Sequence, residues 1–148
     1  MSQHAVFRPY EAKDRAACRA LFDENCPDFF APNERAEYAE FLDSSPQGYE
    51  VCILDDQLVG AFGLHAHDSG DLAVRWIMVS RQVHGRGLGS TMMTRVLSSA
   101  RSMGAKRLHI AASHKSAPFF ARFGALETAR ITDGWGPEMH RVEMQIGF

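Results

Sequence analysis

The stretch from Val79 to Ser90, with the sequence VSRQVHGRGLGS, constrains the fold of this chain more than any other. It follows an apolar run of strand composition over residues 72–79 and precedes an amphipathic helix pattern over residues 90–102. Glycines alternate through the connection, and glycine permits tight turns and close approach of a ligand to backbone N–H groups. A helix start adds unpaired N–H groups and the positive end of the helix dipole. The stretch therefore predicts an anion site, most often one for phosphate.

Two common glycine-rich phosphate loops do not fit this stretch. No lysine follows the glycines, as a P-loop would require. The spacing of Gly85, Gly87 and Gly89 is not that of the G-x-G-x-x-G dinucleotide fingerprint. A plain strand-to-helix turn is the remaining alternative.

The same residues resemble the Q/R-x-x-G-x-G/A loop of GNAT N-acetyltransferases, which grips the pyrophosphate of acetyl-CoA. His84 stands where Gln or Arg is usual, at a position that contributes mainly backbone in the family. The resemblance implies acetyl-CoA as the cosubstrate. The residues it implies for the cofactor loop are His84, Gly85, Arg86, Gly87, Leu88, Gly89 and Ser90.

The order of patterns along the chain predicts an α/β (α+β) fold in one domain, residues 1–148. Strand patterns over residues 6–8, 49–54, 58–67 and 72–79 indicate an antiparallel meander, and residues 128–132 and 141–146 a C-terminal hairpin. Helix patterns begin near Asp14, Pro32, Ser90 and Ser116. A strand over residues 108–112 would lie parallel to residues 72–79 through a right-handed crossover. The resemblance implies the GNAT fold, a mixed sheet with flanking helices.

Four apolar residues in a row, Trp76 to Val79, break the alternation of the last meander strand. They fit either a strand buried on both faces or a β-bulge. In the family a bulge here splays the parallel strands apart, and the V between them holds the pantetheine arm of the cofactor. The resemblance thus assigns pantetheine and oxyanion contacts to the backbone of Ile77, Met78 and Val79.

A second motif, Ala117 to Gly124, resembles the family signature A-x-x-F-Y-x-x-x-G-F. The resemblance adds His114, Phe119 and Phe120 to the cofactor contacts. His114 stands at the usual Asn, and Phe120 at the Tyr that commonly protonates the CoA thiolate as it leaves. Phe120 has no proton to give, so water or another side chain does that work, or the thiolate leaves unaided.

Aromatic residues mark a candidate acceptor pocket, and the predicted set is Phe29, Phe30, Trp76 and Trp135. By resemblance, the helix–loop–helix unit containing Phe29 and Phe30 walls the acceptor site. A hydrophobic plug between two helices is the alternative for this pair. Trp135, in the predicted hairpin loop DGWGPEM, either closes over an acceptor or caps the end of the sheet.

Acetyl transfer to an amine needs a base that takes a proton from nitrogen. His65 and His67 lie two apart on one predicted strand and therefore face the same way. Histidine has a suitable pKa, although either ring could equally be a hydrogen-bonded structural residue. Glu34, Glu50 and Asp71 are further candidates. The His-Ala-His spacing supplies two metal ligands where zinc requires at least three, so no metal is predicted.

Composition limits the partners of the chain. A net charge of −2 gives no electrostatic case for nucleic acid, and no apolar run approaches the 18 residues of a membrane span. Three cysteines without pairing and the lack of a signal peptide favour a cytoplasmic location.

The resemblance implies an N-acetyltransferase that moves an acetyl group from acetyl-CoA to a primary amine by direct attack in a ternary complex. The enclosing aromatic residues favour a small-molecule acceptor. A non-catalytic CoA-binding module and a protein or peptide N-acetyltransferase are the alternatives. A homodimer is left open.

Overall fold

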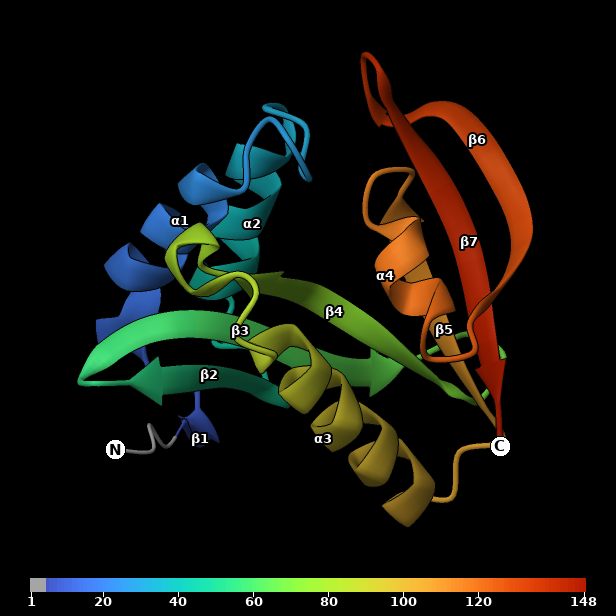
Figure 1. The fold of residues 1–148 in the computed structure, drawn as a ribbon, viewed down its shortest axis with the longest axis horizontal. Coiled ribbons are helices and arrows are strands. Elements are labelled where there is room, and N and C mark those ends of the chain that lie inside the picture. Colours follow the sequence, from blue (N-terminus) through green and yellow to red (C-terminus); the bar gives the residue numbers. More distant parts are fainter. Residues whose placement is uncertain (1–4) are drawn as a thin grey trace.

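The computed structural model describes residues 5–148, so residues 1–4 of the predicted domain lie outside it. Within the described residues, seven strands form one mixed sheet in the order β1-β2-β3-β4-β5-β7-β6 (Figure 1). Their bounds are β1 Val6–Pro9, β2 Tyr49–Leu54, β3 Gln57–Ala66, β4 Leu72–Val79, β5 Arg107–Ser113, β6 Leu126–Gly136 and β7 Met139–Gly147. The antiparallel meander β1–β4, the parallel pair β4/β5 and the C-terminal hairpin β6–β7 are all as predicted.

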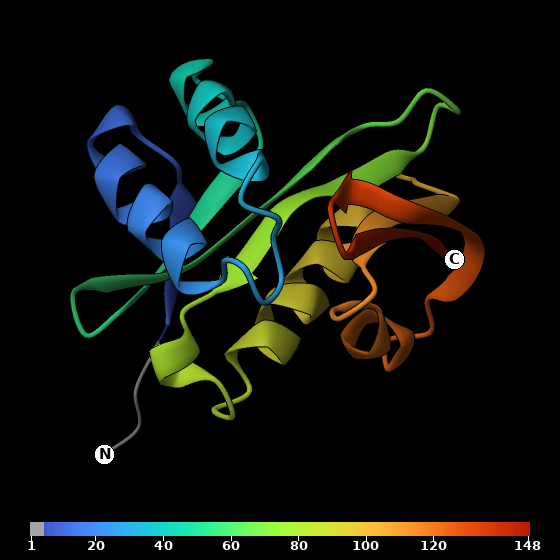
Figure 2. The ribbon, with the colours of Figure 1, turned by 90° about the horizontal axis from the view of Figure 1, so that it is seen from above.

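Helices cover both faces of the sheet (Figure 2). They are α1 Arg15–Glu24, α2 Glu34–Asp43, α3 Leu88–Ser102 and α4 Ala117–Ala121. The sheet therefore separates two hydrophobic cores, one on each face. Two neighbouring residues of β3 illustrate this, because consecutive strand residues point to opposite faces. Ala61 packs in the core beneath α1 and α2, whereas Phe62 packs in the core beneath α3 and α4.

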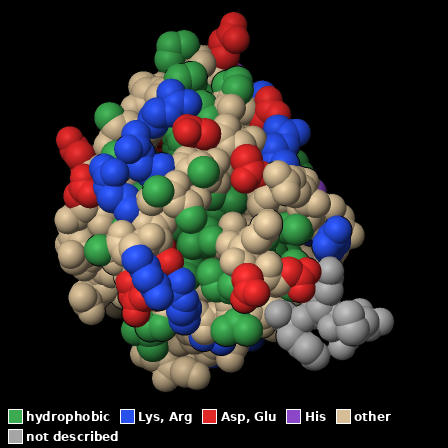
Figure 3. Space-filling model, turned by 90° about the vertical axis from the view of Figure 1, so that its left-hand side faces the viewer, with side chains coloured by type: hydrophobic (Ala, Val, Ile, Leu, Met, Phe, Trp, Pro, Cys, Tyr) green, Lys and Arg blue, Asp and Glu red, His purple; other side chains and the backbone are tan. Residues whose placement is uncertain are grey.

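The pair α1–α2 is held by its buried face rather than by its surface. Exposed ion pairs, Arg15 with Asp43 at 2.5 Å and Arg35 with Asp23 at 2.9 Å, join the two helices. Basic and acidic side chains stand beside one another on the face drawn in Figure 3. Such exposed pairs contribute about 0–1 kcal/mol each. The buried core between these helices and the sheet therefore supplies most of the stabilisation.

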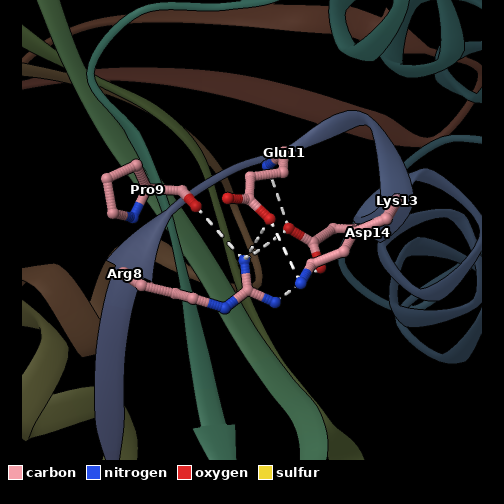
Figure 4. Close-up of polar contacts among 5 residues, drawn as sticks. All are labelled: Arg8, Pro9, Glu11, Lys13 and Asp14. Carbon is pink, nitrogen blue, oxygen red and sulfur yellow. Dashed lines mark hydrogen bonds and ion pairs between the residues drawn. The ribbon is translucent and has the colours of Figure 1, made fainter.

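A partly buried ion pair connects the end of β1 to the start of α1 (Figure 4). Arg8 donates two hydrogen bonds of 2.7 Å to the carboxylate of Asp14, which is 7% exposed. The same carboxylate accepts a 2.9 Å bond from the N–H of Glu11. Asp14 occupies the predicted N-cap position, but its side chain binds Arg8 and Glu11 instead of capping α1. The Arg8 guanidinium lowers the pKa of Asp14.

β4 contains a β-bulge, which is one of the two explanations given above for its run of apolar residues. Ala61 pairs with Met78 and Gly63 pairs with Arg75, so Phe62 alone faces both Trp76 and Ile77. Trp76 has a φ of +40°, a backbone conformation that residues other than glycine rarely adopt. The extra residue bends β4 away from β5, the strand on its other side.

The parallel strands β4 and β5 are hydrogen-bonded only at one end. Leu72 pairs with Leu108 and Ala73 with His109, and no further pair follows among the described residues. From there β5 continues along β7, and β4 continues along β3 (Figure 1). The two strands thus open into a V whose inner edge on β4 runs from Val74 to Val79.

Several element boundaries differ from those predicted, and those of α2, α3 and the C-terminal hairpin differ in ways that affect the site. α2 begins at Glu34 rather than Pro32, and α3 begins at Leu88 because Gly87 takes the left-handed cap position. The C-terminal hairpin is longer than expected, and only Pro137 and Glu138 lie between its strands. Trp135 is therefore the penultimate residue of β6 and not part of a loop.

Candidate functional site

A cavity of about 760 Å³ occupies the V between β4 and β5. Its walls come from β4, the glycine loop with the start of α3, the α1–α2 connection, β5, α4 and the far end of the hairpin. Elements from both ends of the chain thus meet around the inner edge of β4. Because β5 does not pair with this stretch of β4, backbone groups of β4 are left for a ligand. The carbonyls of Trp76 and Val79 are exceptions, since each accepts a hydrogen bond from a side chain.

The glycine loop forms one end of the cavity and has the conformation of an anion site. Gly85 and Gly87 have φ values of +85° and +76°, which favour glycine strongly. The first bond of α3 runs from Thr91 N–H to the Gly87 carbonyl at 3.0 Å. The N–H groups of residues 88–90 therefore have no partner inside the helix. Three backbone donors and the helix dipole point to this end of the cavity.

Most residues predicted for the cofactor loop line the cavity: His84, Gly85, Gly87, Leu88, Gly89 and Ser90 do so, and Arg86 does not. The ring of His84 lies 3.2 Å from the carbonyl oxygen of Val79, to which the side-chain amide of Asn25 also donates at 3.1 Å. These contacts tie the loop and α1 to the end of β4.

α4 closes the cavity beside the start of α3. A Cβ on Gly89 would lie 3.2 Å from the ring of Phe119, so the close contact between these elements requires glycine there. Phe119 and Phe120 both line the cavity, and Phe120 is 4% exposed. His114 lies outside the cavity lining, and its Nδ1 accepts a 3.1 Å bond from the N–H of His140. In this structure His114 joins β5 to β7.

Aromatic side chains form the other end of the cavity, and all four predicted ones line it: Phe29, Phe30, Trp76 and Trp135. Phe30 also stacks on Phe22 of the α1–α2 core at 5.1 Å, so it serves both as pocket wall and as hydrophobic plug. The indole N–H of Trp135 donates to the carbonyl of Ala112 at 2.9 Å, which holds the ring across β5.

A hydrogen bond connects the two sides of the V above the cavity. The side-chain amide of Asn33, just before α2, donates to the carbonyl of Trp135 in β6 at 2.7 Å. The contact is close, because a Cβ on Gly136 would overlap the side-chain oxygen of Asn33. Residues 102 apart in sequence thus join the α1–α2 connection to the C-terminal hairpin.

Two of the five predicted base candidates line the cavity, and they differ in environment. Glu34 is 3% exposed, and its carboxylate accepts a 2.8 Å bond from the N–H of Ala31. Burial raises the pKa of Glu34 to about 7. Burial lowers the pKa of His65, and the positive charge of Arg75 lowers it further. Glu34 is therefore balanced between its two protonation states near neutral pH.

The other three base candidates lie outside the cavity lining. His67 follows the end of β3, and its ring stacks on His109 at 3.7 Å. Glu50 forms an ion pair with Arg95 at 2.7 Å, and Asp71 accepts the N–H of Lys106 at 3.3 Å. The structure thus separates His65 from His67, although the two are close in sequence.

Several cavity residues were missed by sequence reasoning because their patterns are ordinary for loops and strands. Ser113 and Ser116 share a hydrogen bond of 3.0 Å beside Phe120. Ser116 was recognised only as a helix cap, and α4 in fact has no side-chain cap bond. Asn25, Arg75 and Arg141 also line the cavity and carried no motif.

In the folded chain, a glycine loop and the start of a helix thus lie at one end of a cavity that follows an open strand edge. A sequence profile described as the acetyltransferase (GNAT) family matches residues 18–125. The chain belongs to that family, as its two motifs predicted. No match was found among the curated proteins.

Solved structures support the same fold over nearly the whole chain. A GCN5-related N-acetyltransferase from Rhodopseudomonas palustris is 23% identical, with a TM-score of 0.78 over 100% of this chain and 99% of its own. A protein assigned to the GNAT family from Desulfovibrio desulfuricans is 22% identical, with a TM-score of 0.74 over 97% and 99%. An acetyltransferase from Salmonella typhimurium, solved with acetyl-CoA, is 15% identical, with a TM-score of 0.72 over 97% and 94%. The chain has the GNAT fold.

Proposed function

We propose that the protein transfers an acetyl group from acetyl-CoA to a primary amine of a small molecule. The observation that carries this proposal is one continuous cavity along the open edge of β4. It joins a glycine loop, where three N–H groups have no partner inside α3, to an aromatic end that contains a buried carboxylate. The first end suits the phosphates of CoA, and the second suits an acceptor.

In the proposed complex, the phosphates bind the N–H groups at the start of α3. The pantetheine arm follows the inner edge of β4 at Ile77, Met78 and Val79. This places the thioester near the bulge, where a backbone N–H stabilises the oxyanion that forms during attack.

Glu34 is the base in this proposal. Its carboxylate accepts a proton as the amine nitrogen attacks the thioester carbonyl, and a pKa of about 7 suits that task near neutral pH. The C–S bond then breaks and the sulfur leaves as thiolate. Phe120 has no proton to return, so we assign that step to water or to the hydroxyl pair of Ser113 and Ser116 beside it. His65 is the second candidate base, because it also lines the cavity.

The hydrogen bond from Asn33 to Trp135 supports a small acceptor over a protein segment, because it connects the two sides of the V above the cavity. The fold itself does not choose between acceptors. Its structural neighbours include an N-acetylglutamate synthase from Neisseria gonorrhoeae and a ribosomal-protein-alanine N-acetyltransferase from Brucella melitensis.

The test is release of free thiol from acetyl-CoA with a panel of amines, amino acids and peptides, and mass spectrometry of the product. Saturable thiol release with a small amine supports the proposal. Turnover only with peptides would assign the protein-acetylating function instead. CoA binding by calorimetry without turnover on any acceptor would leave a non-catalytic CoA-binding module.

A further inference from the structure

Two of the arginines that line the cavity have no acidic partner among residues 5–148: Arg122, which is exposed and lies over the ring of Phe119, and Arg75. Arg75 of β4 is half-buried and lines the cavity, and its guanidinium lies 4.7 Å from the ring centre of Phe41 in α2. No carboxylate of residues 5–148 lies within ion-pair distance of it. Arg141, which also lines the cavity, is instead paired with Glu143. A half-buried charge without a counter-ion loses hydration and gains no ion pair in return.

The cofactor phosphates do not explain this charge. The glycine loop begins beyond the C-terminal end of β4, and Arg75 lies four residues before Val79, roughly 13 Å away along a strand. Arg75 also contacts α2, on the face of the sheet opposite α3. An arginine for phosphate would be expected near the N-terminus of α3.

The surroundings of Arg75 belong to the acceptor end of the cavity. It immediately precedes Trp76, and Trp76 contacts the same Phe41 ring at 6.3 Å. His65, on the neighbouring strand, lines the cavity as well, and the positive charge of Arg75 lowers its pKa. Among the described cavity residues, Glu34 is the one carboxylate. The acceptor end thus presents a fixed cation and, separately, a carboxylate suited to an amine.

We propose that Arg75 binds a carboxylate of the acceptor, so that the substrates are amino acids and related amino-carboxylates. This inference rests on the proposed function. A guanidinium presents two parallel N–H donors that match a carboxylate, and stacking on Phe41 limits its orientations. The acceptor amine would then lie toward Glu34, and its carboxylate would supply the counter-ion that Arg75 lacks.

The experiment compares matched acceptors that differ in one group. L-phenylalanine, L-methionine and L-glutamate are assayed with acetyl-CoA beside their α-carboxamides, with wild type, Arg75→Gln and Arg75→Lys. We expect wild type to prefer the acids in kcat/KM by about 10- to 100-fold. Arg75→Gln should remove that preference by slowing the acids alone, and Arg75→Lys should restore part of it. Equal use of acids and amides by wild type, or equal slowing of both by Arg75→Gln, would overturn the proposal.

A matched control separates lost packing from lost recognition. Arg101 is also stacked on a ring, at 5.0 Å from Phe148, and lies at the far end of α3 outside the cavity lining. Arg101→Gln should leave the acid preference unchanged, and thermal unfolding reports the folding of each variant.

Failure of the proposed function would be recognised separately. If no acceptor releases thiol, acetyl transfer is rejected, and calorimetry of the same three acids with the CoA-saturated protein tests Arg75 directly. Binding by wild type that is lost in Arg75→Gln would still support a carboxylate site. Absence of binding to wild type would overturn it.

Discussion

The hydroxyl of Tyr49 donates a 2.7 Å hydrogen bond to the carbonyl oxygen of Trp76, the residue with positive φ in the β4 bulge. Since this bond uses the single hydroxyl proton of Tyr49, the 2.8 Å contact between Tyr38 and Tyr49 must be donated by Tyr38. Both tyrosines are buried, at 1% and 2% exposure. Tyr49 lies in the core, outside the cavity lining, and its hydrogen bond thus stabilises the bulge.

Tyr49→Phe should therefore lower both stability and activity, although Tyr49 does not line the cavity. Removing the donor leaves the Trp76 carbonyl without that bond and should lower the free energy of unfolding by about 1–3 kcal/mol. Tyr38→Phe is the matched control, because it also deletes one buried hydroxyl but keeps the bond to Trp76. We expect both variants to lose stability and only Tyr49→Phe to lower kcat. Equal kinetic loss in both would show that the bulge does not depend on this bond.

Gly87→Ala should weaken CoA binding. Gly87 has positive φ, and a Cβ added there would have no neighbour within 4 Å, so the methyl group would enter the space assigned to the phosphates. Gly104, at the other end of α3, has nearly the same φ, +78°, and equally open surroundings. Both Ala variants should lose about 1–2 kcal/mol of stability, because an L-residue with a Cβ is strained in the left-handed conformation. Calorimetry should show a tenfold or greater loss of CoA affinity, about 1.4 kcal/mol, for Gly87→Ala alone.

Glu34→Gln should abolish the pH dependence that the base imposes. In wild type the rate should rise through a pKa of about 7 as Glu34 ionises, and the variant should lose this limb with a fall in kcat of about 10²–10⁴. Acceptors of different amine pKa separate this limb from ionisation of the substrate. Glu40→Gln, at an exposed position in the same helix, is the control, because Glu40 does not contribute to the raised pKa of Glu34. If His65→Ala removes the limb instead, the base is the histidine.

The free energy of unfolding should also depend on pH through Glu34, and it should fall as pH rises. Burial raises the pKa of Glu34 in the folded state, so its neutral form is favoured there. Its contribution to stability is complete below the unfolded-state pKa, about 4.3, and is lost as pH rises through about 7. Chemical denaturation across this window should show wild type losing stability relative to Glu34→Gln. A difference that stays constant from about pH 4 to about pH 8 would contradict the assignment.

Phe120 should act through shape rather than proton transfer. Phe120→Ala removes a buried ring and should cost about 3–5 kcal/mol of stability together with CoA affinity. Met93→Ala, at a fully buried position in α3 outside the cavity lining, should lose stability without the specific loss of affinity. Phe120→Tyr should keep or modestly raise activity. Normal CoA binding and stability in Phe120→Ala would show that the ring does not pack beside the cofactor.

The features that local sequence encodes were predictable. Glycines at alternate positions after an apolar strand indicated the anion loop, and the interrupted alternation at Trp76 indicated the bulge as one of two explanations. Strand and helix periodicity predicted the meander, the crossover and the hairpin. These properties depend on backbone conformation and on neighbours a few residues away.

The arrangement of the acceptor end depends on contacts between distant segments, and sequence spacing did not resolve it. Glu34 and His65 were both candidate bases, and only packing of the α1–α2 connection distinguishes the buried carboxylate. His67 shares the sequence neighbourhood of His65, yet the end of β3 turns its ring toward His109. Trp135 was predicted in a loop because Gly134 and Gly136 flank it, whereas pairing with β7 extends the strand through it.

The open edge of β4 has a further consequence, for self-association. An unpaired strand edge can accept a strand from another chain, and natural proteins cover such edges or keep them short. Here the edge lies inside a cavity, behind the α1–α2 connection and the hairpin, where another chain cannot easily reach it. The cofactor, in the proposed complex, occupies the same backbone positions. We therefore expect acetyl-CoA to slow aggregation of the heated protein beyond its effect on the unfolding midpoint, because it fills the edge that an incoming strand would use.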